Sequence, residues 1–156
     1  MVIDNVLTED ALRQCCAADA WVAGVLAGRP YPDEEALGAR SDSVTAALDD
    51  TGLAQALAGH PRIGERAHSA WSQQEQSGVA DAGADVREQL AAANAEYERR
   101  FGHVYLVCAS GRSADELLAV CRSRLDNDPA TERGVVIAEL AKINRLRLGK
   151  LLRGES

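Results

Sequence analysis

The chain has 156 residues, of which 46% are hydrophobic and 26% charged, and a formal net charge of −7 at neutral pH. This length is typical of one globular domain that buries a core without disulfides or metals. The acidic balance argues against a nucleic-acid surface, which needs clustered Lys and Arg, and no apolar run is long enough to cross a membrane.

Residues that accept hydrogen bonds from helix starts organise the first 60 positions. The candidate N-caps are Thr8 for a helix over 9–12, Asp19 for one over 21–26, and Asp33 for one running toward Leu48 and ending by Gly52. A short apolar piece over 53–57 then leads into a loop.

Three longer helices are expected in the rest of the chain. They are a helix over about 85–100 closed by Gly102, one opened by the capping box Ser113-Ala114-Asp115-Glu116 and ending near Asn127, and one opened by Asp128-Pro129 and ending near Leu152. The apolar run 104–109 has no second run to pair with, so we expect a buried extended segment. The sequence predicts an all-α fold, a compact single domain over 1–156 with an irregular bundle of about seven to nine helices.

Cysteine usage suggests a reducing compartment. The four cysteines, at 15, 16, 108 and 121, show no C-x-x-C spacing. We therefore expect buried free thiols and a cytoplasmic protein.

The segment His60-Pro61-Arg62-Ile63-Gly64-Glu65 is the most informative part of the chain. Proline biases the preceding backbone away from the helical region, and the glycine lets the chain turn. An imidazole on such a stiff loop suits proton transfer near neutral pH. A histidine that only holds a turn is the structural alternative.

Ser72-Gln73-Gln74-Glu75 matches the S-x-x-E capping box, in which the glutamate only satisfies a backbone N–H at a helix start. A capping carboxylate can also face a cleft. Both a structural and a catalytic role for Glu75 therefore stay open.

Arg147 lies on the apolar stripe of the last predicted helix. At 100° per residue the stripe consists of Val136, Leu140, Ile143, Arg147 and Leu151. A buried guanidinium is costly unless it is paired. Arg147 therefore reaches the rim, bonds a buried carboxylate, or binds an anionic ligand in a pocket.

Other chemistries lack their sequence patterns. We expect no metal site, because His-x-x-x-His, His-x-x-Glu and paired Cys/His spacings are all missing. No serine occupies a Gly-x-Ser-x-Gly elbow, and no glycine loop is long enough to cradle a phosphate.

Taken together, these segments resemble the 2-oxo-4-hydroxy-4-carboxy-5-ureidoimidazoline (OHCU) decarboxylase family. The matching pieces are His60-Pro61-Arg62-Ile63-Gly64-Glu65, Ser72-x-x-Glu75-Gln76, Asn94-x-x-Tyr97-x-x-x-Phe101-Gly102 and Ile143-x-x-Leu146-Arg147-Leu148. They follow in family order. Two departures are a short segment between Glu65 and Ser72, and His103-Val104-Tyr105 in place of a more aromatic pattern.

The resemblance implies an all-helical carboxy-lyase, without metal or organic cofactor, that converts OHCU to (S)-allantoin and CO2 in urate breakdown. It implies that His60 and Glu75 are catalytic and that Arg147 binds the substrate carboxylate. The implied substrate-lining residues are Pro61, Ser72, Gln76 and the main chain around His103, Val104, Tyr105, Leu106 and Val107. The expected partner is this small molecule, with neither nucleic acid nor membrane, and a homo-oligomer stays open.

Two alternatives belong to other functional classes. A non-catalytic helical module would bind a small ureido or carboxylate ligand without releasing CO2. A purely structural interaction domain would leave His60 and Glu75 far apart or pointing outward.

Overall fold

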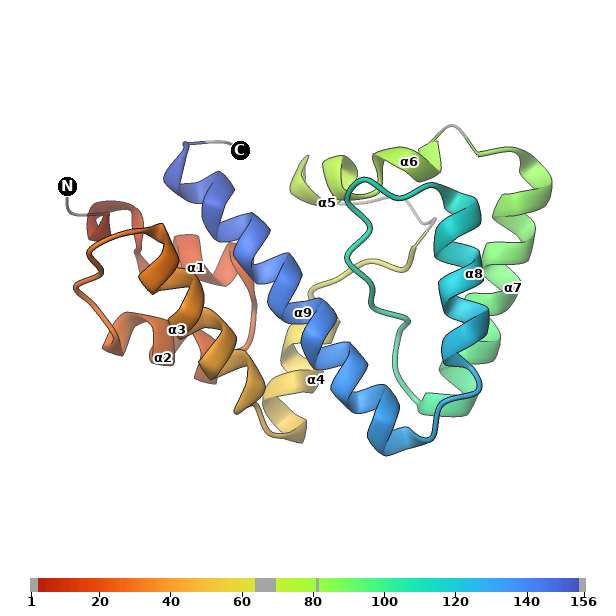
Figure 1. Ribbon diagram of the computed structural model, residues 1–156, viewed down its shortest axis with the longest axis horizontal. Helices are drawn as coiled ribbons and strands as arrows, with labels where there is room; N and C mark the ends of the chain where they lie inside the picture. The colour runs from red at the N-terminus through yellow and green to blue at the C-terminus, as the bar shows by residue number, and fades with distance from the viewer. Residues whose placement is uncertain (1–2, 64–69, 81, 155–156) are drawn as a thin grey trace. The chain divides into compact units, whose positions relative to one another are not determined.

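The computed structural model describes residues 3–63, 70–80 and 82–154 (Figure 1). These residues form nine α-helices and one short 3₁₀ helix and contain no β-strand, which confirms the predicted all-α fold. The chain divides into two compact units, unit 1 (Met1–Gly59 and Leu140–Ser156) and unit 2 (His60–Glu139). Helix α9 (Pro129–Leu152) starts in unit 2 and ends in unit 1.

Unit 1 consists of short helices joined by tight turns. Besides the end of α9, its helices are η1 (Asp4–Val6), α1 (Glu9–Cys15), α2 (Asp19–Ala27), α3 (Glu34–Ala46) and α4 (Asp50–Ala58). The predicted caps of α1 and α3 are confirmed, since Thr8 and Asp33 accept the N–H groups of Ala11 and Ala36 at 3.2 and 2.8 Å. Asp19 is instead the first residue of α2, and its carboxylate accepts a hydrogen bond from Arg13 at 2.7 Å.

The helix opened by Asp33 is shorter than predicted. It ends at Ala46, and a separate helix, α4, includes the apolar piece 53–57. The carboxylate of Asp49 accepts the N–H of Gly52 at 2.8 Å, so this residue is the N-cap of a second helix that begins before the predicted end of the first.

Neutral hydrogen bonds link α2, α3 and α9 inside unit 1. The indole of Trp21 donates to Ser41 Oγ at 3.2 Å, and Thr45 Oγ1 donates to the Ser41 carbonyl at 2.7 Å. Asn144 Nδ2 donates to Thr45 Oγ1 at 3.2 Å. All four side chains are buried.

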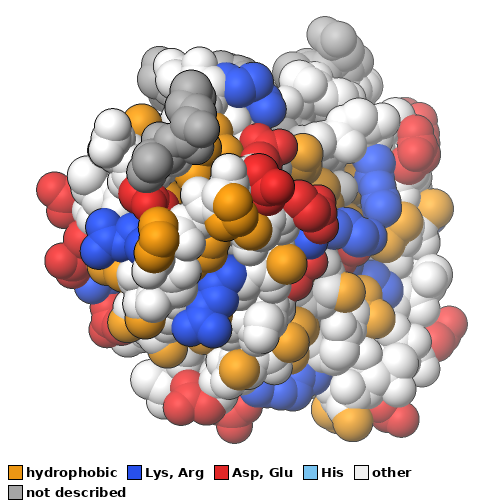
Figure 2. Space-filling model, turned by 60° about the vertical axis from the view of Figure 1, so that its left-hand side comes forward, with side chains coloured by type: hydrophobic (Ala, Val, Ile, Leu, Met, Phe, Trp, Pro, Cys, Tyr) orange, Lys and Arg blue, Asp and Glu red, His pale blue; other side chains and the backbone are white. Residues whose placement is uncertain are grey.

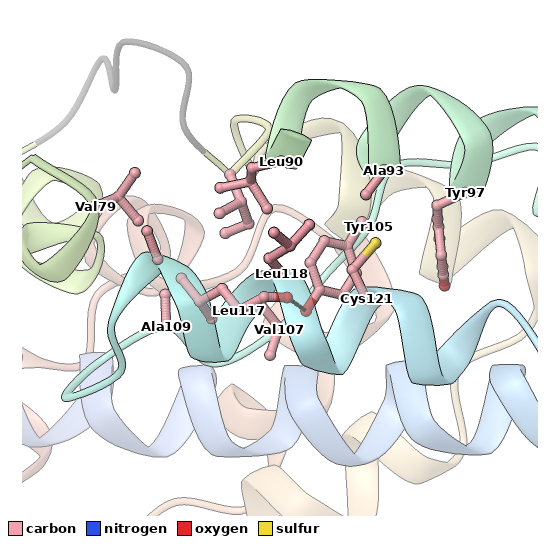
Figure 3. Close-up of a cluster of buried hydrophobic side chains, with 12 residues drawn as sticks. Val79, Leu90, Ala93, Tyr97, Tyr105, Val107, Ala109, Leu117, Leu118 and Cys121 are labelled. Atoms are coloured by element: carbon pink, nitrogen blue, oxygen red, sulfur yellow. Dashed lines mark hydrogen bonds between the residues drawn. The ribbon is translucent and has the colours of Figure 1, made fainter. Parts of the chain in front are cut away.

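Unit 2 is built on two long helices lying side by side (Figure 1). Its helices are α5 (Ala70–Glu75), α6 (Ser77–Ala80), α7 (Ala84–Phe101), α8 (Ala114–Arg124) and the start of α9. Figure 3 shows its core, where side chains from α7, α8 and the segment between them meet. The buried members are Ile63, Val79, Leu90, Ala93, Tyr97, Tyr105, Val107, Ala109, Ala114, Leu117, Leu118 and Cys121.

The predicted boundaries in unit 2 are largely confirmed. Helix α7 ends at Phe101 and is closed by Gly102, whose φ of 78° favours glycine. The run 104–109 is non-helical, and four of its residues are buried. Ser113 and Glu116 form the predicted capping box of α8, and Asp128 accepts the N–H of Thr131 at 2.7 Å at the start of α9.

Charged side chains and cysteines were two of the features of the composition considered in the sequence. On the face drawn in Figure 2, acidic and basic side chains are interspersed. All four cysteines are free; three are buried as predicted, whereas Cys108 is half-buried. None of the described helices combines the length and the apolar character needed to span a bilayer.

Candidate active site

The loop that begins at His60 is anchored on α7. His60 and Pro61 are half-buried, and the next two residues fix the loop. Arg62 pairs with Glu98 at 2.5 Å, and Asn94 Nδ2 donates to the carbonyl of Ile63 at 2.8 Å. These contacts explain the positions of Arg62 and Ile63 in the motif, while Gly64 and Glu65 lie outside the described residues.

The extended segment 103–109 is held by side chains of α8 and α9. Arg124 Nη1 donates to the Leu106 carbonyl at 2.7 Å, and the Cys108 N–H donates to Glu139 at 3.1 Å. The hydroxyl of Tyr105 donates to the Leu117 carbonyl at 2.9 Å, a bond drawn in Figure 3. The Tyr105 side chain therefore belongs to the core.

Arg124 and Glu132 form a buried ion pair behind this segment. Arg124 Nε donates to Glu132 at 2.8 Å, and the Tyr97 hydroxyl donates to the same carboxylate. Burial opposes the charge of Glu132, but the bonds from Arg124, Tyr97 and Asn127 outweigh it and hold the pKa of this carboxyl below its ordinary value. The guanidinium also lies 5.0 Å from the ring centroid of Tyr105.

The phenols of Tyr97 and Tyr105 and the thiol of Cys121 lie near this pair and are neutral at pH 7, and burial raises the pKa of each of them further. Burial and the bond to the Glu132 carboxylate raise the pKa of Tyr97, burial raises that of Tyr105, and burial raises the pKa of Cys121 to about 11. The network thus contains one positive charge, on Arg124, and one negative charge, on Glu132, and it holds the extended segment at Leu106. Proton-transfer chemistry would need other residues.

Glu75 is the last residue of α5 and its side chain is only 8% exposed. The capping-box interpretation is wrong, because α5 begins at Ala70 and Ser72 is its third residue. A residue inside a helix cannot be its N-cap. The outward-pointing arrangement expected for a purely structural domain is also excluded for Glu75. The backbone of Ser72 belongs to α5, and its side chain is not described. Gln76 is half-buried.

Helix α6 brings this part of the chain against the segment that leads into α8. A Cβ on Gly78 would collide with the carbonyl oxygen of Arg112, so only glycine permits this close approach. Gly78 follows Glu75, the last residue of α5, by three residues. The connection between α7 and α8 is therefore contacted by α6 near Arg112 and bonded by Arg124 at Leu106.

His103 and Val104 are half-buried, and Leu106 and Val107 are buried. The His103 ring lies edge-on to Tyr97, with centroids 5.5 Å apart. Its Nδ1 is 3.0 Å from the Val104 carbonyl oxygen. The ring thus packs on the end of α7.

Arg147 belongs to the part of α9 that lies in unit 1. The helical period of the sequence predicted that Arg147 lies on the buried stripe of this helix. Its side chain is 5% exposed, and Nη1 donates to the Cys15 carbonyl at 3.2 Å. His60, Glu75 and the segment 103–107 belong to unit 2. The convergence of Arg147 with His60 and Glu75 on one substrate stays a prediction.

Arg124 and Glu132 were missed by the sequence analysis. A usable signal exists, since Arg124 follows Leu117 and Cys121 at helical spacing on the buried face of α8. The same argument identified Arg147. For Glu132 and Glu139 no local pattern shows that the carboxylates turn inward.

Comparison with known proteins identifies the family. The model of the OHCU decarboxylase family matches residues 4–149. The 2-oxo-4-hydroxy-4-carboxy-5-ureidoimidazoline decarboxylase of Amia calva is 31% identical over 137 residues, covering 83% of this chain and 78% of that protein.

Two further comparisons extend the likeness over most of the chain. The uric acid degradation bifunctional protein TTL of Arabidopsis thaliana is 28% identical over 152 residues, covering 92% of this chain and 47% of that protein, so the chain spans about half its length. A crystal structure of OHCU decarboxylase in the presence of (S)-allantoin shares the fold, with a TM-score of 0.83 and 24% identity over 94% of this chain and 99% of that one. The family match and the Amia calva relative show that this chain belongs to the OHCU decarboxylase family.

Proposed function

We propose that this protein decarboxylates OHCU to (S)-allantoin and CO2, in urate breakdown. The observation that carries the proposal is the family match over residues 4–149, which includes the segments of His60, Glu75 and Arg147. Within unit 2, a half-buried histidine on an anchored loop and a buried carboxylate at the end of α5 support it. Positioned titratable groups of this kind can carry out proton transfer.

The reaction breaks the bond between a ring carbon and the carboxyl group. The electron pair of that bond enters the unsaturated ring of the substrate, and one face of the ring then receives a proton. Because the substrate itself accepts the electrons, no organic cofactor or metal is required. The protein supplies position, fixed charge and one stereospecific protonation.

Each proposed role follows from side-chain chemistry. The planar guanidinium of Arg147 binds the departing carboxylate in bidentate fashion. His60 donates or shuttles the proton, and Glu75 holds a ring hydroxyl or N–H and sets the charge of the histidine. Pro61, Ser72, Gln76 and the main chain of 103–107 line the substrate.

The decisive assay generates OHCU in situ from urate by enzymatic oxidation and hydrolysis. We expect the protein to accelerate the loss of OHCU and to produce an excess of (S)-allantoin, followed by circular dichroism. The same assay after exhaustive chelation should show unchanged activity. A rate equal to that in buffer, with racemic allantoin, would contradict the proposal.

Binding without turnover is the outcome that favours the alternative, a non-catalytic module for a ureido or carboxylate ligand. In that case (S)-allantoin would raise the melting temperature while OHCU decayed at its spontaneous rate. A crystal structure with (S)-allantoin tests the convergence of the three catalytic residues directly. Arg147 far from the ligand would remove its carboxylate-binding role.

We further propose that the two units fold as one domain, which the continuity of α9 through both supports. The protein acts in the cytoplasm on a small molecule. Sedimentation would decide whether it forms a homo-oligomer.

A further inference from the structure

The two tryptophans of this chain differ in how their indole N–H groups are satisfied. Trp21 is fully buried and donates to Ser41 Oγ at 3.2 Å. Trp71 is 7% exposed, and its Nε1 is buried with no acceptor in the part of the chain that the structure describes. A buried tryptophan N–H normally has a partner, because shielding an unpaired donor from water is costly. Trp71 therefore needs an explanation that Trp21 does not.

The position of Trp71 supplies that explanation. It lies four residues before Glu75 in α5, so both side chains project from the same face of the helix. Both side chains are more than nine-tenths buried. One face of α5 thus carries both an indole N–H donor and a carboxylate.

A ureidoimidazoline ring offers the complementary groups, since its amide-type N–H groups are donors and its carbonyl oxygens are acceptors. We propose that Trp71 is a substrate-binding residue, whose indole N–H donates to a carbonyl oxygen of the substrate while Glu75 accepts from a hydroxyl or N–H of the same molecule. This inference rests on the proposed function. An indole N–H does not titrate near neutral pH, so Trp71 orients the substrate and takes no part in proton transfer.

The proposal makes the substitutions Trp71→Phe and Trp21→Phe a matched pair. Each removes one indole N–H and keeps an aromatic ring. Trp71→Phe should lower kcat/KM for OHCU about tenfold, mainly through KM, because a site built around a hydrogen bond loses affinity when the donor is removed. It should not lower the melting temperature by more than Trp21→Phe does. Trp21→Phe should keep the KM of the wild type, because neither Trp21 nor its partner Ser41 has a proposed role in binding.

Nuclear magnetic resonance of the uniformly ¹⁵N-labelled wild-type protein gives a second readout that does not depend on either variant being active. Two indole N–H signals are expected, and the one missing from Trp71→Phe belongs to Trp71. Titration with (S)-allantoin should move that signal downfield and leave the Trp21 signal in place.

The outcomes separate the two proposals. Wild-type turnover with an unmoved Trp71 signal, and a kcat/KM of Trp71→Phe within twofold of wild type, overturns the role of Trp71 and leaves the decarboxylase standing. A wild-type protein that neither converts OHCU nor binds (S)-allantoin overturns both.

Discussion

The buried side-chain networks of the two units differ in charge, although unit 1 also buries the guanidinium of Arg147. In unit 1 the buried bonds among Trp21, Ser41, Thr45 and Asn144 are neutral and connect helices, whose backbones are already satisfied. In unit 2 a charged pair, Arg124 and Glu132, bonds the carbonyl of an extended segment. Buried backbone outside a helix must find its partners elsewhere, and charged donors make the strongest bonds.

The difference teaches which bonds hold the shape of the candidate site. Unit 2 contains both irregular segments with proposed substrate contacts, the His60 loop and the run 103–107, and each is fixed by an arginine. The neutral bonds of unit 1 hold only helix against helix. Changes in the charged network should therefore alter activity as well as stability, whereas changes in the neutral one should alter stability alone.

The largest expected effect is the loss of activity caused by changing Glu75, the buried carboxylate at the end of α5. Glu75→Gln should lower kcat about 10²–10⁴-fold, because an amide can neither accept a proton nor stabilise a protonated His60. The melting temperature should change by only a few degrees, since the shape of the side chain is kept. The OHCU assay and a thermal melt measure both quantities.

The double variant His60→Asn with Glu75→Gln is the control for this prediction. It should lose little more activity than the worse single variant, because residues in one proton relay are not additive. Near-full decarboxylation by Glu75→Gln would return this residue to a structural role.

The next effect tests the ion pair of unit 2. Glu132→Gln should lower the free energy of unfolding by about 3–5 kcal/mol, because the Arg124 charge would be buried without its partner. Glu96→Gln is the matched control, since its pair with Arg99 is exposed and should contribute less than about 1 kcal/mol. Urea unfolding at pH 7 measures both. Equal losses in the two variants would show that the buried pair contributes no more to the free energy of unfolding than the exposed pair does.

A pH series sharpens the same point. Because the pKa of Glu132 is lowered in the folded protein, its charge contributes stability above the ordinary value near 4.5, and this stability is lost as the pH falls through the folded value. The difference in unfolding free energy between wild type and Glu132→Gln should therefore shrink as the pH is lowered from 7 to 3. A difference that stays constant over this range contradicts the assignment.

Local chemistry made most of the fold predictable. Thr8, Asp33, Ser113 and Asp128 were identified as caps because an N-cap acts within three residues of its own position. The end of α3 was predicted to come by Gly52, but the start of α4 at Asp50 was missed because its cap, Asp49, follows a run that continues the helical pattern. A cap inside such a run is recognised only in the structure, where the backbone leaves the helical conformation at that residue.

The candidate site divides in the same way. His60, Glu75 and Arg147 were proposed from motif and helical phase, and the burial of Glu75 and Arg147 agrees with that proposal. The pairing of Arg124 with Glu132 joins two helices across a turn, so neither helix alone predicts it. That Trp71 Nε1 has no acceptor among the described residues is likewise a property of the folded chain and cannot be read from the sequence.

The smallest effects give the most direct comparison of the two units, because each variant deletes one buried hydroxyl. Tyr97→Phe removes a bond to the charged Glu132 and should lower the free energy of unfolding by about 1.5–3 kcal/mol. Thr45→Val removes the neutral bonds to Ser41 and Asn144 and should cost about 1 kcal/mol.

Kinetics separate this pair of variants further. Tyr97→Phe should raise the KM for OHCU, because the pair that it loosens holds the Leu106 carbonyl in the proposed substrate-lining segment. Thr45→Val should leave KM and kcat unchanged at a temperature where both variants are fully folded. An unchanged KM in Tyr97→Phe, together with the expected loss of stability, would show that the charged network supports the fold of unit 2 without shaping the site.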